Sequence, residues 1–232
     1  MKKLSFVIPS FNSVAWLSHA IESCQKQDYA NTEIIVVDDG STDTTPILMK
    51  FLCDKDKRIS YIRLPKNVGR SNARNIGNDT AKGDYICVLD ADDVSYPNRA
   101  KLTVNKLEKA DFVHGSFDFM DVIGSKLDTH YAEVFSLDRA MKERLNFMVH
   151  SSVAYTKEIA RQFQYPEGEL ADLGLDDWSQ QLAIASSGAK IDFILPVIGA
   201  YRDHGEGVSK KRDSAKVIAA KEKFLESMKV PA

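Results

Sequence analysis

Short apolar runs alternate with longer amphipathic segments through the first 110 residues of the chain. The apolar runs predict strands at Leu4–Ile8, Glu33–Val37, Ile59–Leu64 and Tyr85–Leu89. The segments that follow them predict helices at Ala15–Gln27, Thr42–Leu52, Ser71–Ala81 and Asn98–Lys109. Repeated strand–helix units of this length predict an α/β fold, in which a mostly parallel central sheet is flanked by helices on both faces.

This alternation stops after residue 110. We expect strands at Asp111–Met120, Val149–Tyr155 and Ile191–Tyr201, a turn at Val122–Lys126, a loop at Pro166–Asp177, and helices at Ser136–Leu145, Asp177–Ser187 and Ser214–Met228. The chain shows no internal repeat and no clear linker. We therefore expect one compact domain over residues 1–212, with functional halves at 1–110 and 111–212, and an amphipathic C-terminal helix within 213–232.

The composition argues against several classes of protein. Hydrophobic residues make up 44% and charged residues 28%, as in soluble globular proteins. A net charge of −2 gives no global field that would draw the chain to nucleic acid or lipid. No stretch approaches the ~18 apolar residues of a membrane span, and the first apolar run is too short for a signal peptide. Three cysteines without zinc or CxxC spacing indicate a reducing compartment, so we expect a cytoplasmic protein.

Polar residues follow each of the first four predicted strands. They form the segments Pro9–Asn12, Asp38–Ser41, Lys66–Arg70 and Asp90–Asp93. Ligands of open parallel sheets bind beyond the carboxyl ends of the strands. These four segments are therefore expected on one edge of the sheet, within reach of one elongated ligand.

The segment Asp90–Asp93 places three carboxylates within four residues, directly after an apolar strand. Hard oxygen ligands at this spacing suit Mg²⁺ or Mn²⁺, and the cation in turn suits a diphosphate. The alternative is a solvated acidic turn that caps the next helix. Eight Lys or Arg and two Asp lie in residues 50–74, and five acids without a base lie in 167–177. These stretches either face one anion–metal site or form two solvated surfaces.

The motifs together resemble those of the family 2 glycosyltransferases, which are inverting enzymes with the GT-A fold. The resemblance runs from Ser5 to about Ser209, and its elements are Val7–Asn12, Val36–Asp43, Gly69–Gly77, Asp90–Asp93, Asp176–Trp178 and Tyr201–His204. It implies a Rossmann-like N-terminal half and a smaller acceptor-side region. It also implies metal-dependent transfer of a sugar from a nucleoside-diphosphate donor, expected to be a UDP-sugar, to an acceptor hydroxyl.

The resemblance assigns the nucleotide to the first half of the chain. Pro9 and Phe11 would shape the floor under the base, and Asp39 would accept a hydrogen bond from it. Arg74 would meet the base or the diphosphate. The alternatives are a helix cap and turn for the residues around Asp39, and a surface arginine for Arg74.

The resemblance also implies a Mn²⁺ or Mg²⁺ site. Asp90 would contact the ribose hydroxyls or a metal-bound water, and Asp92 would bind the metal, supported by Asp93. His204 would complete the metal shell or contact a phosphate, and Arg202 could also meet a phosphate. Residues 203–212 are expected to form a lid over the sugar nucleotide.

The general base of an inverting transfer is expected in the pair Asp176 and Asp177, and we favour Asp177. The family more often has Glu first in this pair, so the register between the two acids stays open by one residue. The alternative is that both are first-turn acids favoured by the helix dipole. His150 and the two serines after it fall where the family's acceptor cleft begins.

Other classes of protein are an inactive nucleotide-sugar-binding homologue, a nucleotidyltransferase, or a scaffold that uses its C-terminal helix. A pure binder has no need of a base at Asp177, and a nucleotidyltransferase should carry a Gly-rich basic loop after the first strand. The acceptor is expected to be a glycan, a lipid-linked sugar or another hydroxyl, and the near-neutral charge disfavours long nucleic acids. The helix at Ser214–Met228 would contact anionic lipid, form a homodimer or simply pack.

Overall fold

The computed structural model of the chain describes residues 1–205 and 213–228. Within these residues nine strands form one sheet in the order β3-β2-β1-β4-β8-β6-β9-β5, and β7 pairs with the second half of β6. The strands are β1 Leu4–Ser10, β2 Thr32–Asp38, β3 Ile59–Arg63, β4 Tyr85–Val88, β5 Val94–Ser95, β6 Phe112–Met120, β7 Lys126–His130, β8 Ala154–Thr156 and β9 Ile191–Arg202. β1 to β4, β6 and β9 share one direction, so the predicted mostly parallel sheet is confirmed.

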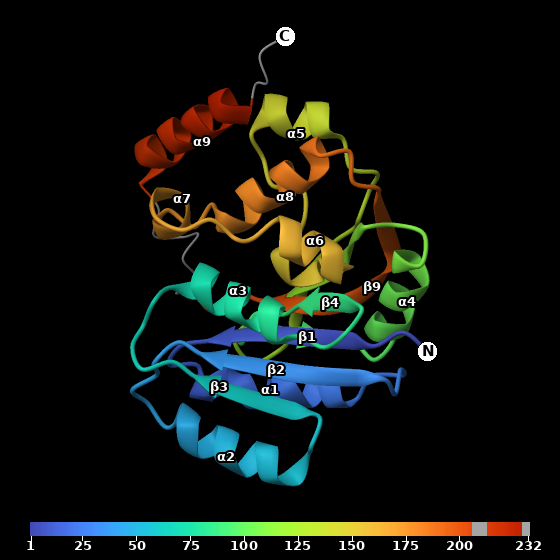
Figure 1. Cartoon of the computed structure of the whole chain (residues 1–232), viewed down its shortest axis with the longest axis vertical. Coiled ribbons are helices and arrows are strands. Elements are labelled where there is room, and N and C mark those ends of the chain that lie inside the picture. The colour runs from blue at the N-terminus through green and yellow to red at the C-terminus, as the bar shows by residue number, and fades with distance from the viewer. Residues whose placement is uncertain (206–212, 229–232) are drawn as a thin grey trace.

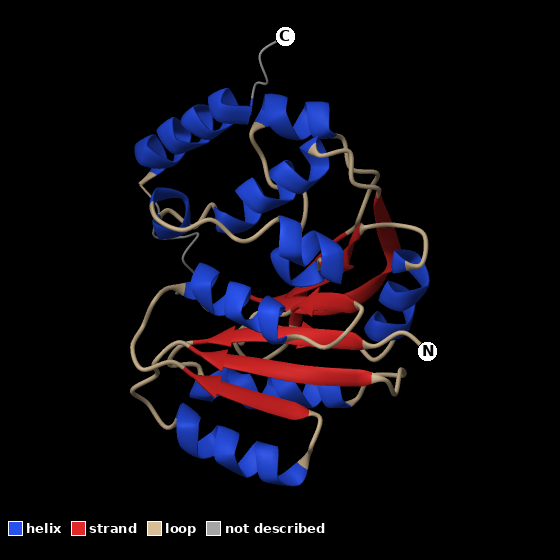
Figure 2. Cartoon of the chain, viewed as in Figure 1, coloured by secondary structure: helices blue, strands red, loops and turns tan. Residues whose placement is uncertain are grey.

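Helices cover both faces of this sheet (Figures 1 and 2). They are α1 Val14–Gln25, α2 Thr45–Lys55, α3 Arg70–Thr80, α4 Arg99–Leu107, α5 Leu137–Glu143, α6 Lys157–Gln162, α7 Glu169–Asp172, α8 Asp176–Ser186 and α9 Ser214–Met228, with a 3₁₀ turn, η1, at His150–Ser152. Side chains of a strand point alternately to the two faces. Phe6 and Ile8 therefore join the core under α1 and α4, while Val7 joins the core under α3 and α6.

The second half of the chain differs from the sequence prediction at several places. It contains β7 and α6, for which no strand or helix was expected. The strand expected at Val149–Tyr155 is divided into η1 and the short strand β8. The serine hydroxyls of η1 accept hydrogen bonds from the backbone N–H groups of Asp90 and Gly115, which holds the segment in a turn. The expected loop at 166–177 contains the short helix α7, and α8 begins inside it at Asp176.

The predicted amphipathic helix near the C-terminus is present as α9. Its Leu225 is buried in a cluster with Ala140, Trp178 and Leu182, and its Phe224 ring lies 5.5 Å from the ring of Trp178. The helix therefore packs on α5 and α8. Contact with anionic lipid and homodimer formation stay predictions, and most of the lid expected at 203–212 lies outside the described residues. No helix within residues 1–205 and 213–228 has the length and apolarity to cross a bilayer.

Helix α3 approaches the sheet closely at Gly77, where a Cβ atom would lie 2.4 Å from Cγ1 of Val7. At a solvent-exposed position inside a helix, the change Gly→Ala stabilises the folded protein by up to about 1 kcal/mol. We expect Gly77→Ala to lower the free energy of unfolding instead, by about 1–3 kcal/mol, because the buried strand beneath must move. Urea unfolding measures this, with Asp79→Ala on the exposed side of α3 as the control. A stabilised Gly77→Ala variant would contradict the close packing.

Candidate active site

A cavity of about 840 Å³ opens at the carboxyl ends of the first strands. Eight residues expected at the site from the sequence line it, namely Pro9, Phe11, Asp39, Arg74, Asp90, Asp92, Asp177 and His204. They come from the ends of β1, β2 and β4, from α3, from the start of α8 and from the segment after β9. The expectation that these loops meet on one edge is therefore confirmed. Asp176 and Arg202, also expected at the site, do not line the cavity.

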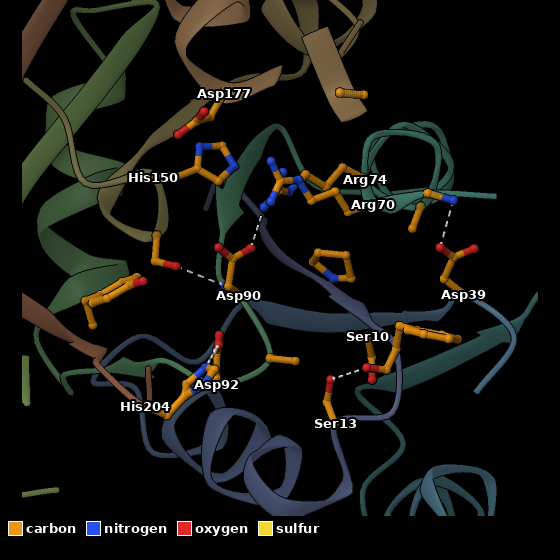
Figure 3. A pocket seen from close by; sticks show the side chains of 18 of the residues that line it. Ser10, Ser13, Asp39, Arg70, Arg74, Asp90, Asp92, His150, Asp177 and His204 are labelled. Atoms are coloured by element: carbon orange, nitrogen blue, oxygen red, sulfur yellow. Dashed lines mark hydrogen bonds and ion pairs between the residues drawn. The ribbon is translucent and has the colours of Figure 1, made fainter. Parts of the chain in front are cut away.

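Asp39 joins the loop after β2 to the loop before α3 at one end of this cavity (Figure 3). Its Oδ1 accepts the backbone N–H of Val68 at 2.7 Å, and its Oδ2 accepts that of Gly69 at 2.9 Å. Gly69 has φ +93°, a conformation that favours glycine. A carboxylate oxygen has two lone pairs, so each can accept one more hydrogen bond. Phe11, which is 45% exposed, lines the same cavity and adds an aromatic surface to it.

Two arginines from α3 meet the start of α8 at the middle of the cavity. Arg74 donates from Nη1 to Asp176 and from Nη2 to Asp90, both at 2.6 Å, and Arg70 also donates to Asp176. Burial would raise the pKa of Asp90, but the charge of Arg74 outweighs it and lowers the pKa to about 2. In the same way, Arg74 and Arg70 outweigh burial and lower the pKa of Asp176. Both carboxylates therefore stay ionised at neutral pH.

The two acids at the start of α8 have different surroundings. The side chain of Asp176 is fully buried and paired with the arginines, so the hypothesis that it shares the role of base does not fit its position. Asp177 faces the cavity and accepts one hydrogen bond, from Nδ2 of Asn146 at 3.1 Å. Of the two, only Asp177 is placed to reach a ligand.

A carboxylate and an imidazole meet where the acidic segment faces the end of β9. Nε2 of His204 lies 2.8 Å from Oδ2 of Asp92, and Figure 3 shows the two side chains together. The imidazole ring also stacks on Trp16, with ring centroids 6.4 Å apart. Burial first, and then the charge of Asp90, raise the pKa of Asp92. Crowded acids of this kind are stabilised by a cation. In the described part of the chain, no three metal-ligating side chains lie together at one point. A cation bound by Asp92 and His204 would therefore take its other ligands from phosphate oxygens and water.

Arg202 has a structural position instead of the expected contact with a phosphate. It is 5% exposed, and its Nε donates to the backbone oxygen of Asp92 at 3.0 Å. Its Nη1 donates to the oxygen of Val122, and its guanidinium lies 4.6 Å from the ring of Trp16. The backbone N–H of Arg202 also donates to the buried carboxylate of Asp93. These contacts fix the acidic segment against β9, and they leave the guanidinium outside the cavity.

The structure adds Arg70 and Asn146 to the site, and it also places His150 there, which was expected where the acceptor cleft begins. Arg70 lies one helical turn before Arg74, and this spacing was a usable signal because residues four apart share a helix face. Asn146 had no signal, since only the folded chain brings it to Asp177. His150 lines the cavity near Asp177 and Asp90, and burial followed by the charge of Arg74 lowers its pKa to about 4. Its imidazole is therefore neutral at physiological pH.

Comparison with known proteins agrees with this geometry. The family model "Glycosyl transferase family 2" matches residues 5–163. An uncharacterized glycosyltransferase of Haemophilus influenzae is 37% identical over 129 residues, which cover 55% of this chain and 52% of the relative. The chain thus spans about half the length of that relative.

Two solved structures share the fold. Residues 1–349 of S. aureus TarS, in complex with UDP, have a TM-score of 0.75 at 19% identity, covering 97% of this chain and 65% of that fragment. The mannosyltransferase PcManGT of Pyrobaculum calidifontis, in complex with GDP-Man and Mn²⁺, has a TM-score of 0.66 at 19% identity, covering 89% and 59%. The predicted GT-A fold is confirmed by these likenesses. Since the family model spans more than half of the sequence and most of the predicted motif residues line one cavity, the chain belongs to glycosyl transferase family 2.

Proposed function

We propose that this protein transfers a sugar from a nucleoside diphosphate to an acceptor hydroxyl. The observation that carries the proposal is one cavity lined by Asp39, by the pair Asp92 and His204, and by Asp177. Family membership supports it. A protein that only binds nucleotide sugars would not need an ionisable acid beyond the diphosphate, so Asp177 favours an enzyme over an inactive homologue.

The donor would lie along the cavity with its base at the Asp39 end. Asp39 can accept the N–H of uracil while it still holds the loop before α3. Phe11 and Pro9 would support the base from below. TarS with UDP supports a uridine nucleotide, and PcManGT with GDP-Man shows that a chain of this fold also takes guanosine. We propose UDP because TarS binds UDP and because a carboxylate acceptor at this point can take the uracil N–H.

A divalent cation would be held by Asp92 and His204, with Asp90 beside them. When bound, it would neutralise the charge that builds on the departing diphosphate. An imidazole ligand favours Mn²⁺ over Mg²⁺, which prefers oxygen. The complex of PcManGT with Mn²⁺ supports this choice.

Asp177 would act as the general base. It would accept the proton of the acceptor hydroxyl while that oxygen attacks the anomeric carbon from the side opposite the diphosphate. The bond from this carbon to the phosphate oxygen breaks, and its electron pair leaves with the nucleoside diphosphate. A single displacement of this kind inverts the anomeric centre. We propose a glycan or a lipid-linked sugar as the acceptor, bound by residues of the second half of the chain.

The experiment that tests this function is a donor panel. Purified protein with Mn²⁺ is incubated with UDP-glucose, UDP-N-acetylglucosamine, UDP-galactose, GDP-mannose and dTDP-glucose, and release of free nucleotide is measured. We expect slow hydrolysis of UDP-sugars, faster by about tenfold or more than of GDP-mannose, which has a purine base, and of dTDP-glucose, which lacks the ribose 2′-hydroxyl. A buried polar group left without its partner costs about 1–3 kcal/mol. Nucleotide binding without turnover of any donor would overturn the proposal in favour of an inactive nucleotide-sugar-binding homologue.

A further inference from the structure

The carboxylate of Asp176 is fully buried between two guanidinium groups. Its Oδ2 accepts Nη1 of Arg74 at 2.6 Å, and its Oδ1 accepts Nε of Arg70 at 3.1 Å. If Asp176 served only to interact with the dipole of α8, its side chain could stay exposed to solvent at the first turn of the helix. Asp176 instead ties the start of α8 to α3, about 100 residues earlier in the chain.

The same contacts continue to the acidic segment after β4. Arg74 is 4% exposed, and its other terminal nitrogen donates to Oδ1 of Asp90 at 2.6 Å. Figure 3 marks this contact with a dashed line. Asp90, Arg74 and Asp176 thus form a chain of charge-assisted hydrogen bonds across the cavity wall. Burial would lower the pKa of Arg74, but the opposite charges of Asp90 and Asp176 outweigh it and raise the pKa. All three side chains therefore stay ionised.

Asp177 is the next residue after the end of this chain of contacts. Asp176 and Asp177 are consecutive in the first turn of α8, so whatever fixes the backbone of one fixes that of the other. The guanidinium of Arg74 is planar and rigid, and it therefore sets a distance between the two carboxylates that it joins. From the other side Asp177 is held only by the amide of Asn146 among the hydrogen bonds of the described residues.

We propose that Asp176 is a positioning residue, which holds Arg74 against Asp90 and thereby sets where the base Asp177 lies relative to the bound donor. The inference rests on the proposed function. It separates the two acids by role, since Asp177 accepts the proton and Asp176 touches neither donor nor acceptor. The two halves of the chain would then be coupled through ion pairs between α3 and α8.

The test compares Asp176→Asn with Asp176→Glu at a temperature where circular dichroism shows both to be folded. We expect Asp176→Asn to lower kcat by about 10- to 100-fold, as for outer partners that orient a reacting group. Its Kd for UDP, measured by calorimetry, should stay within about threefold of wild type, because the base-binding end is untouched. Asp176→Glu keeps a charge for both arginines and should recover most of the lost kcat. A purely stabilising residue would change the melting temperature and leave kcat of the folded protein unchanged.

A double-mutant cycle with Arg74→Lys gives a second readout. If both residues act through one chain of contacts, the combined loss in kcat should be smaller than the product of the two single losses. If Asp176→Asn does not fold, Arg74→Lys alone tests the proposal. Lysine keeps the positive charge but lacks the planar guanidinium that donates to both carboxylates. We then expect kcat to fall by a larger factor than the affinity for UDP, since Arg74 lines the donor cavity and lysine keeps its charge.

The outcomes separate this inference from the function beneath it. Full kcat in folded Asp176→Asn, or in Arg74→Lys where that variant decides, would overturn the positioning role and leave the transferase proposal standing. Independent effects in the cycle would also overturn it. A wild-type protein that neither binds UDP nor releases nucleotide from any donor would remove the proposed function itself.

Discussion

Asp177→Asn is expected to lower kcat for sugar transfer by about 10²- to 10⁴-fold, the usual contribution of a general base. Asparagine keeps the size of the side chain and can still contact Asn146, but it cannot accept a proton from the acceptor hydroxyl. Affinity for UDP should change by no more than about twofold, because in the proposed arrangement Asp177 lies beyond the nucleotide and would take the proton of the acceptor hydroxyl only in the transition state. The measurement is initial transfer rate and UDP calorimetry on the same preparation.

The matched control for this variant is Asp138→Asn. Asp138 is an exposed acid in the first turn of α5, as Asp177 is a first-turn acid of α8. Both substitutions remove the same favourable interaction with a helix dipole, which is about 0.3–1 kcal/mol. Asp138→Asn should therefore lose similar stability and keep full activity. If Asp177→Asn were as active as this control, the base would have to be another residue.

Asp92→Asn is expected to weaken Mn²⁺-dependent binding of UDP by about 100-fold or more, since loss of even an outer partner of a metal ligand costs 10- to 100-fold. The amide keeps the shape of Asp92 but removes the negative charge that the cation would meet. UDP affinity without metal should stay close to that of wild type, because Asp39 and Phe11 are unchanged. The measurement is UDP calorimetry at several Mn²⁺ concentrations.

Two controls make this result specific. Asp54→Asn on the exposed side of α2 removes one negative charge far from the cavity and should leave Mn²⁺ dependence as in wild type. Addition of EDTA to wild type should reproduce the affinity of Asp92→Asn. If UDP binding by wild type were insensitive to both Mn²⁺ and EDTA, the pair Asp92 and His204 would not hold a metal ion that contributes to donor binding.

The parallel sheet and its polar edge could be predicted because they depend on local patterns. A strand buried on both faces needs an apolar run, so Ile34 to Val37 marked β2 directly. Strands that run in one direction place their carboxyl ends at one edge of the sheet. The sequence therefore predicted that Asp39 and Asp90 lie at the same edge, as they do. The amphipathic spacing of Ser214–Met228 likewise marked α9.

The segment at 149–155 could not be predicted in the same way. Its residues have β propensity, but the hydroxyls of Ser151 and Ser152 accept hydrogen bonds from backbone N–H groups. These groups belong to Asp90, just after β4, and to Gly115 in β6. These partners lie 61 and 37 residues away, so no local window contains the interaction that bends the chain there. Tertiary contacts of this kind override propensity.

The sequence by itself determined which polar groups lie at the edge of the sheet, and the family motifs among them. The tertiary structure alone decided which of these groups pair with one another and which remain open to a ligand. Adjacent residues of a helix point about 100° apart, so the rotation of α8 sends Asp176 to the arginines of α3 and Asp177 to the cavity. Arg202, beside His204 in the motif, is likewise taken up by backbone oxygens. Ion pairs depend on the separation of charges in space, and that separation is set by packing between segments about 100 residues apart.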